Sequence, residues 1–152
     1  MKIVFNLLRE ELIDLEDSSK SSSEFLEMIS NRLGEKSYVK ETFREAIVAR
    51  EREFPTGLQL EGTAVAIPHT YVEHVIKPFI SFSKILHPIP FIQMGTDDVT
   101  VNAEYVMVLG ITDPKSQTGL LVELMELFSD PQFIDSLNHA RTKQDVISLF
   151  TN

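Results

Sequence analysis

Apolar and polar residues alternate with helical spacing in the first third of the chain. Ser21 and Glu24 have the spacing of a capping box, in which a hydroxyl and a carboxylate satisfy free backbone N–H groups at a helix start. Gly34 supplies a stop signal. Between these signals, four apolar residues fall on one helical face: Phe25, Met28, Ile29 and Leu33. The pattern predicts an amphipathic helix that ends near Gly34.

The same reasoning predicts further helices. Pro55 and Gly57 end a second apolar stripe, whose inward residues are Val39, Phe43, Ala46 and Ile47. Pro131 has the first-turn position that proline favours, and Thr142 with Asp145 again has capping-box spacing. We therefore expect helices over about residues 39–52, 117–129, from 131 onward, and from about 142 to the end of the chain.

Four short segments have the composition of strands, rich in apolar and β-branched residues. The segment 104–111 is nearly all apolar, as expected for a strand covered on both faces. The other candidates are residues 11–15, 63–67 and 79–85. Because strands and helices alternate along the chain, the pattern predicts an α/β fold. We expect a single three-layer α/β/α sandwich over residues 1–152, with a central mixed sheet and helices on both faces.

Charge and composition narrow the function. The 152 residues are 43% apolar and include 23 acidic and 14 basic residues, a formal charge of −9. Such a surface repels nucleic acid and anionic lipid, so we expect neither as a partner. No cysteine is present, which excludes disulfides, thiolate nucleophiles and cysteine-bound metal. No apolar run approaches the ~18 residues of a membrane span, so we expect a cytoplasmic protein without membrane insertion.

The four histidines differ in their surroundings. His139 lies among polar residues and His87 lies in a turn-like "LHPIP", so both are interpreted as surface or structural. His74 follows His69 by five residues, the wrong offset to share a helix face. His69 directly follows Pro68, which lacks the N–H needed to continue a central strand. His69 therefore falls at a strand end, where open α/β sheets present binding groups.

The segment "GTAVAIPHT" resembles the active-site signature of the enzyme IIA components of the bacterial sugar phosphotransferase system, in their fructose–mannitol superfamily. In that family the motif consists of a glycine, a short apolar strand and then Pro-His. The histidine of this motif is transiently phosphorylated. The resemblance covers roughly residues 8–150. With "EFPTG", "AIPH" and a glutamine at position 117 in combination, it is most similar to the galactitol-type branch. It implies that His69 is the phosphoryl acceptor, through Nε2, with the other ring nitrogen held by a backbone carbonyl.

The resemblance also implies supporting residues. Arg50 matches the family arginine that stabilises the phosphate, and Arg52 remains a competitor for that role. Gln117 stands where many relatives carry a second histidine, so it could offer a single hydrogen bond near the phosphohistidine. The Thr70 hydroxyl and nearby backbone N–H groups are further candidates. No cofactor and no metal are implied, and the chain has no P-loop motif for ATP.

The family resemblance implies a relay between proteins. The donor would be the small phosphocarrier protein HPr, and the acceptor a cysteine of the cognate IIB, which works with the membrane permease IIC. Candidate contact residues for these partners are Tyr71, Val72 and the "IPFIQM" segment, residues 89–94, which we interpret as a loop. The alternative for this segment and both residues is simple packing.

Two other functions compete with this interpretation. A regulatory IIA-like domain would sense phosphorylation and bind a protein partner instead of feeding a transporter. A metal-dependent hydrolase would use His69, His74, His87 and the pair Asp97–Asp98, but these residues form no recognisable ligand spacing. A scaffold that has lost activity is disfavoured because His69 and an upstream arginine are both present.

Overall fold

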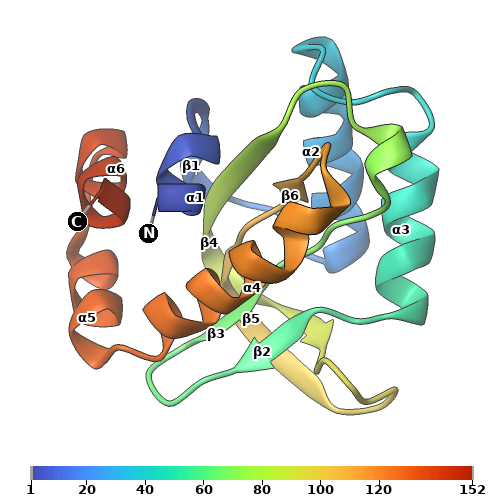
Figure 1. Ribbon diagram of the computed structural model, residues 1–152. Helices are drawn as coiled ribbons and strands as arrows, with labels where there is room; N and C mark the ends of the chain where they lie inside the picture. Colours follow the sequence, from blue (N-terminus) through green and yellow to red (C-terminus); the bar gives the residue numbers. More distant parts are fainter. Residues whose placement is uncertain (1, 152) are drawn as a thin grey trace.

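The computed structural model describes residues 2–151 and contains a mixed six-stranded sheet covered by helices on both faces (Figure 1). The strands are β1 (Leu8–Asp17), β2 (Gly57–Gln59), β3 (Ala64–Ala66), β4 (Phe79–Ile92), β5 (Thr100–Val106) and β6 (Leu109–Gly110). The helices are α1 (Lys2–Leu7), α2 (Ser22–Glu35), α3 (Phe43–Glu53), α4 (Pro114–Phe128), α5 (Pro131–His139) and α6 (Lys143–Thr151), with a 3-10 turn at Val72–His74.

The strand order is β1-β4-β5-β3-β2, with β6 paired to β4 beyond the end of β5. The β1–β4 and β3–β5 pairs are parallel, whereas β4–β5, β2–β3 and β4–β6 are antiparallel. The sheet is therefore mixed, as predicted. Parallel strands need a long connection between them, and the segment that contains β4 connects β3 to its parallel neighbour β5.

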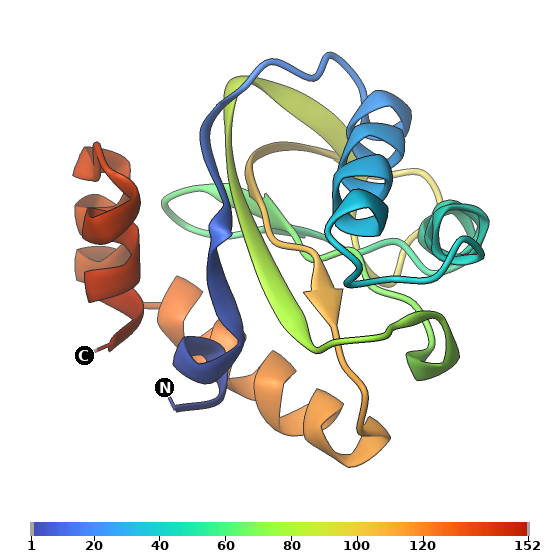
Figure 2. The same cartoon turned by 90° about the horizontal axis from the view of Figure 1, so that it is seen from above.

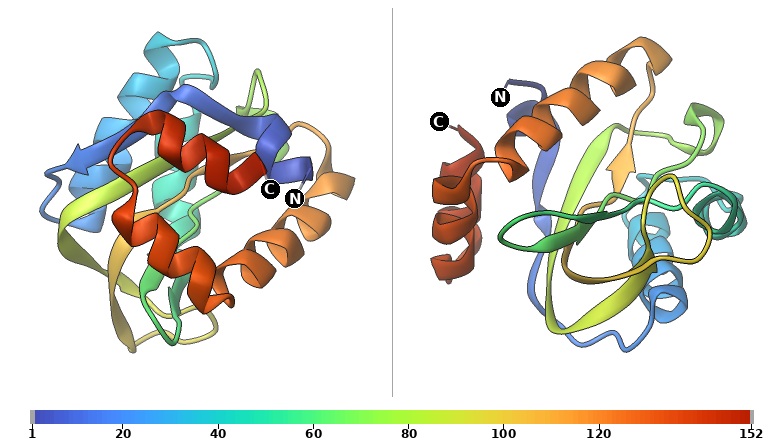
Figure 3. Two further views of the ribbon diagram at one scale, coloured as in Figure 1. Left: turned by 90° about the vertical axis from the view of Figure 1, so that its left-hand side faces the viewer. Right: turned by 90° about the horizontal axis from the view of Figure 1, so that it is seen from below.

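Two apolar cores lie on opposite faces of the sheet. Helices lie against both of these faces, which makes the three-layer arrangement (Figures 2 and 3). One core joins the sheet to α2 and α3 and includes Phe25, Phe43 and Phe79. The other joins it to α4, α5 and α6 and includes Phe82 and Phe150. The predicted α/β/α sandwich is confirmed. Among the described residues, every helix is too short or too polar to cross a bilayer.

The helix predictions hold in position, but α4 begins at Pro114 and not at residue 117, and the start of α3 also differs. Helix α2 ends at Glu35, near Gly34 as predicted, and its end is a Schellman motif centred on Ser37, whose φ is +63°. The Tyr38 N–H donates to the Leu33 carbonyl at 3.0 Å, which closes the last turn. Helix α3 begins at residue 43, not 39, because Val39 forms an antiparallel bridge with Val75 that holds it extended.

The predicted strand over residues 104–111 is split into β5 and β6. Ser81 causes the break, because its hydroxyl accepts the Val108 N–H at 3.1 Å in place of a ladder carbonyl. Beyond the break, Gly110 lies against the Phe79 ring, and a Cβ at position 110 would fall 2.0 Å from that ring. Only glycine fits there. The register against β4 continues unchanged across this break, and β6 then pairs with His69 through Leu109.

The chain also contains elements that the pattern did not predict. Helix α1 precedes β1, and the short β2 pairs with β3. Gly57 begins β2, and a Cβ there would approach the Ile92 carbonyl oxygen to 2.6 Å, so only glycine permits this crossing. Strand β4 extends to Ile92, seven residues beyond the predicted end at Ile85. His87 therefore lies inside a strand, at a register irregularity between Lys84 and Ile89, and not in a turn.

Candidate functional site

His69 lies at the end of β3, where the backbone leaves the sheet. The Pro68 carbonyl accepts the Leu109 N–H at 3.0 Å, and His69 forms a parallel bridge with Leu109 of β6. Pro68 has no N–H to donate, so it takes part in the pairing only through its carbonyl. The backbone of the candidate nucleophile is thus held against β6 just beyond the end of β3.

The imidazole ring of His69 is oriented by its own chain. Its Nδ1 lies 2.8 Å from the carbonyl oxygen of Ile67, two residues earlier. Because a carbonyl only accepts, Nδ1 carries the proton and donates it to Ile67. In the neutral ring, Nε2 is then the nitrogen with the free lone pair.

Burial keeps this ring neutral. Removal from water lowers the pKa of His69 below its ordinary value of 6.5, and repulsion from the Arg50 guanidinium lowers the pKa further. The hydrogen bond to the Ile67 carbonyl acts in the opposite sense, because it stabilises the imidazolium. The net lowering means that the nucleophilic form of His69 predominates at neutral pH.

Arg50 comes to the site from the last turn of α3. Its guanidinium carbon lies 4.2 Å from the centre of the Phe54 ring and 5.2 Å from the centre of the Tyr71 ring. The Nε and Nη1 atoms of Arg50 are buried and have no hydrogen-bond partner. A buried donor without a partner costs free energy, so these atoms are ready to receive an acceptor.

Arg52, the competing arginine, is exposed to solvent on α3. The electrostatic influence on His69 comes from Arg50. The structure therefore brings Arg50, and not Arg52, to the surroundings of the histidine. Its role in binding phosphate stays a prediction.

Thr70 and Gln117, the other candidate donors, differ in their burial. Thr70 is buried, and its hydroxyl is a further buried polar atom without a partner. Gln117 lies one turn into α4, whose N-terminus follows β6 by only a few residues, and it is half-buried. Within residues 2–151, the side chain of Gln117 makes no hydrogen bond to His69. Its part in the site also stays a prediction.

Glu51, next to Arg50, was not singled out from the sequence. Its carboxylate accepts the Thr56 N–H and the Thr56 hydroxyl, both at 2.8 Å, and so closes the turn between α3 and β2. Burial raises the pKa of Glu51 to about 7, although the two bonds from Thr56 and the charge of Arg50 oppose the rise. The acid is thus committed to Thr56 and does not pair with Arg50.

The remaining histidines lie elsewhere. The Nδ1 of His74 is 2.7 Å from the Thr42 hydroxyl and ties the 3-10 turn to the start of α3. His139 is exposed and its Nδ1 is 2.8 Å from the Asp135 carbonyl oxygen, as expected for a surface residue. Within the described part of the chain, no three His, Asp or Glu side chains gather in a way that could hold a metal ion.

The segment 89–94 is not the loop that the sequence suggested. Residues 89–92 belong to β4, and Ile89 and Phe91 are buried in the core on the α2–α3 face. Those two residues pack, as the alternative interpretation had it. Met94 is exposed, and so is Tyr71 beside Arg50.

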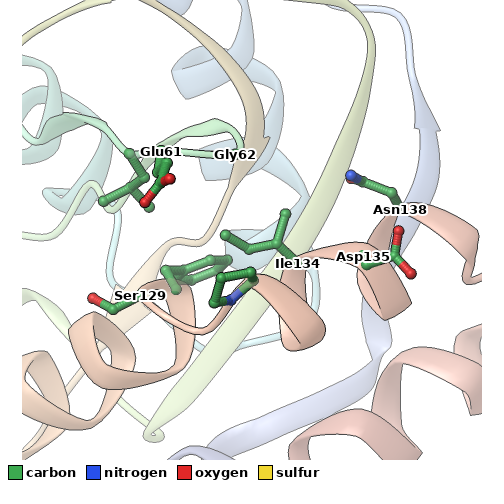
Figure 4. Close-up of a pocket in the computed structure, with 9 residues that line it drawn as sticks. Glu61, Gly62, Ser129, Ile134, Asp135 and Asn138 are labelled. Carbon is green, nitrogen blue, oxygen red and sulfur yellow. The ribbon is translucent and has the colours of Figure 1, made fainter.

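A pocket of about 470 Å³ lies away from these residues (Figure 4). Glu61 and Gly62 border it from the turn between β2 and β3, while Ser129 and Ile134 border it from the end of α4 and from α5. Its lining includes neither His69 nor Arg50. This pocket is therefore separate from the candidate chemistry around His69.

An α/β sandwich that presents a neutral, oriented imidazole beside an unpaired guanidinium is suited to handling a phosphoryl group. The sequence matches the family described as "Phosphoenolpyruvate-dependent sugar phosphotransferase system, EIIA 2" over residues 6–152. The chain belongs to this family.

Individual relatives agree with this assignment. The galactitol-specific EIIA component of Escherichia coli K12 is 35% identical over 115 residues, which cover 76% of each protein. The structure resembles IIA-Ntr, a nitrogen regulatory protein of Neisseria meningitidis, with a TM-score of 0.74, 20% identity and coverage of 97% and 98%. It also resembles the mannitol enzyme IIA of E. coli, solved in complex with phosphorylated IIB, with a TM-score of 0.73, 22% identity and coverage of 95% and 96%.

Proposed function

We propose that residues 1–152 act as one phosphoryl carrier of a sugar phosphotransferase system in the cytoplasm. His69 accepts a phosphoryl group from phosphorylated HPr and passes it to a cysteine of the cognate IIB, and through IIB it serves the permease IIC. Galactitol is the candidate substrate of that permease, because the 35% identical relative is a galactitol-specific component. The observation that carries the proposal is the bond between His69 Nδ1 and the Ile67 carbonyl, which leaves Nε2 free.

In the acceptance step, the Nε2 lone pair of His69 attacks the phosphorus of the donor phosphohistidine. A new N–P bond forms, the donor N–P bond breaks, and its electron pair returns to the donor ring. The proton on Nδ1 stays in place, so the phosphorylated ring is cationic. The Ile67 carbonyl faces that N–H and stabilises the positive charge.

Phosphoryl transfer passes through a loose transition state whose charge lies on three equatorial oxygens. Arg50 supplies a permanent charge and donor atoms that have no other partner. The Thr70 hydroxyl is a second unpaired donor, and Gln117 could add the N–H of a neutral amide. Donors already desolvated before the reaction need little reorganisation, which is the source of their catalytic effect.

The onward step reverses the first with a different acceptor. A thiolate of IIB attacks the phosphorus, an S–P bond forms, and the electron pair of the N–P bond returns to His69 Nε2. The mannitol relative has been solved with phosphorylated IIB, which supports a IIB protein as the partner of this chain also.

Incubation with enzyme I, HPr and phosphoenolpyruvate, followed by intact-mass measurement, tests the proposal. We expect one acid-labile phosphoryl group on the wild-type chain and none on His69→Ala. The variants His74→Ala and His139→Ala are matched controls that should be labelled normally. Labelling that survives His69→Ala, or an acid-stable phosphate, would contradict the assignment. Transfer onward to a purified cysteine-bearing IIB separates a transport role from the regulatory alternative.

A further inference from the structure

The guanidinium of Arg50 lies between aromatic rings from two different segments. Phe54 is the residue that caps the C-terminus of α3, directly after the helix that carries Arg50. Tyr71 comes from a separate segment, two residues after His69. The guanidinium carbon is within 6 Å of both ring centres, the range in which a cation is attracted to an aromatic face.

The rings do not behave as core residues. Phe54 is 51% exposed and Tyr71 is 56% exposed, although both side chains are large and apolar. Buried apolar packing therefore does not explain their position. Both rings lie instead against a cation, the Arg50 guanidinium, whose Nε and Nη1 atoms have no hydrogen-bond partner.

This arrangement differs from the usual way of holding an arginine. A carboxylate would bind the guanidinium through its N–H groups and neutralise its charge. The adjacent acid, Glu51, is bound instead to the N–H and hydroxyl of Thr56. An aromatic face attracts the cation from above its plane, so the N–H edges remain available to another acceptor.

We propose that Phe54 and Tyr71 form an aromatic clamp that positions the Arg50 guanidinium beside His69 with its donors free for the phosphoryl oxygens. The clamp rests on the proposed function, because it deepens the role of Arg50 in that reaction. Phe54 and Tyr71 are positioning residues and need not touch the phosphoryl group. Because Tyr71 follows His69 closely in the chain, the clamp also links the nucleophile's segment to the C-terminal end of α3.

Variants that keep apolar bulk but lose the aromatic face test the clamp. Phe54→Leu and Tyr71→Leu should each lower kcat for transfer from phosphorylated HPr by about 3- to 30-fold, the range expected for one cation–π contact. The KM for HPr should stay nearly unchanged. The matched controls Phe54→Tyr and Tyr71→Phe keep the ring and should retain nearly full kcat. Thermal melts would show whether each variant is folded, and the two positions test the same claim independently.

Two further measurements distinguish rings that position Arg50 from rings that only contact the partner protein. In an Arg50→Gln background, Phe54→Leu should cause no further loss of kcat, because the cation that the ring holds is absent. The pKa of His69, followed by NMR, should rise in Phe54→Leu, because a released guanidinium moves away from the imidazole.

A rise in KM with unchanged kcat, or an equal loss in the Arg50→Gln background, would overturn the clamp and mark the rings as partner contacts. Loss of activity in Phe54→Tyr and Tyr71→Phe would overturn it as well. These results are distinct from failure of the proposed function, in which His69→Ala would still be phosphorylated.

Discussion

The Nδ1 atom of His69 is hydrogen-bonded to the carbonyl oxygen of Ile67, with only Pro68 between the two residues. The end of a strand thus orients its own histidine, and no second side chain is needed to fix the tautomer. Proline suits the intervening position because it fixes φ and removes an N–H that would otherwise compete for an acceptor. The relationship connects a three-residue sequence motif directly to the chemistry of one nitrogen atom.

The first prediction concerns the titration of His69. Burial and the charge of Arg50 both disfavour the imidazolium, so His69 should titrate below 6.5. Phosphoryl acceptance should therefore decline at a lower pH than it would for an ordinary imidazole, with a midpoint below 6.5. Proton NMR of the four imidazole rings, with His69→Ala for assignment, measures the midpoint directly.

Arg50→Gln should raise the pKa of His69 relative to wild type, because the substitution removes a repelling positive charge. Arg52→Gln is the matched control, since Arg52 is exposed on the same helix. It should leave the His69 titration unchanged. An unchanged His69 pKa in Arg50→Gln would show that the guanidinium does not act on the imidazole.

Arg50→Gln should also lower the rate of phosphoryl transfer by about 100- to 1,000-fold, the usual effect of removing one preorganised donor group. Arg50→Lys should restore only part of the rate, because an ammonium lacks the planar fork. Rapid-quench measurement of transfer from phosphorylated HPr gives these rates. Arg52→Gln should transfer normally. A loss of rate in Arg52→Gln equal to that in Arg50→Gln would contradict the assignment of phosphate binding to Arg50.

Gln117→Ala should have a small effect. A neutral amide contributes one hydrogen bond, worth about 0.5–1.5 kcal/mol, so transfer should slow by roughly 2- to 10-fold. Gln117→His, which introduces the residue that the resemblance implies for many relatives, should retain transfer. The same rapid-quench assay applies. A loss comparable to that of Arg50→Gln would mean that Gln117 has a larger role than a single neutral bond allows.

The raised pKa of Glu51 predicts that the free energy of unfolding depends on pH. Its pKa is about 7 in the folded chain against 4.5 for an ordinary glutamate, so the folded state binds the extra proton between these values. The stabilising contribution is therefore present below about pH 4.5 and is lost as the pH rises through about 7.

Glu51→Gln keeps both bonds to Thr56, because the amide oxygen can accept the N–H and the amide nitrogen can donate to the hydroxyl. This variant should match wild type at about pH 4.5 and exceed its free energy of unfolding by up to about 3 kcal/mol well above pH 7. Urea unfolding at a series of pH values checks this. A constant difference between the two proteins would contradict the raised pKa.

Much of the fold was predictable because its signals are local. The hydroxyls of Ser21 and Thr142 accept the N–H groups of Glu24 and Asp145, and Pro131 begins α5 as its position indicated. Local signals failed where tertiary contacts decide. Ser81 breaks a strand by offering its hydroxyl to Val108, and Val39 is held extended by Val75, more than thirty residues away.

The site shows the same division. His69 could be found from the sequence because Pro-His ends an apolar strand, and the resemblance then indicated Arg50. The Ile67 carbonyl could not be named, because the ring's rotation about its own side-chain bonds chooses the acceptor. Nor could Phe54 and Tyr71 be joined to Arg50, since cation–π contacts have no sequence spacing. Glu51 escaped notice because its high pKa comes from burial.

The most direct measurement is the identity of the nitrogen that carries phosphorus. Protein labelled with ¹⁵N at histidine, phosphorylated by enzyme I and HPr, would be studied by ¹⁵N and ³¹P NMR. The account predicts one phosphorus, bonded to Nε2 of His69, with Nδ1 still protonated toward Ile67. Phosphorus on Nδ1 of His69, or on any other histidine, would contradict it.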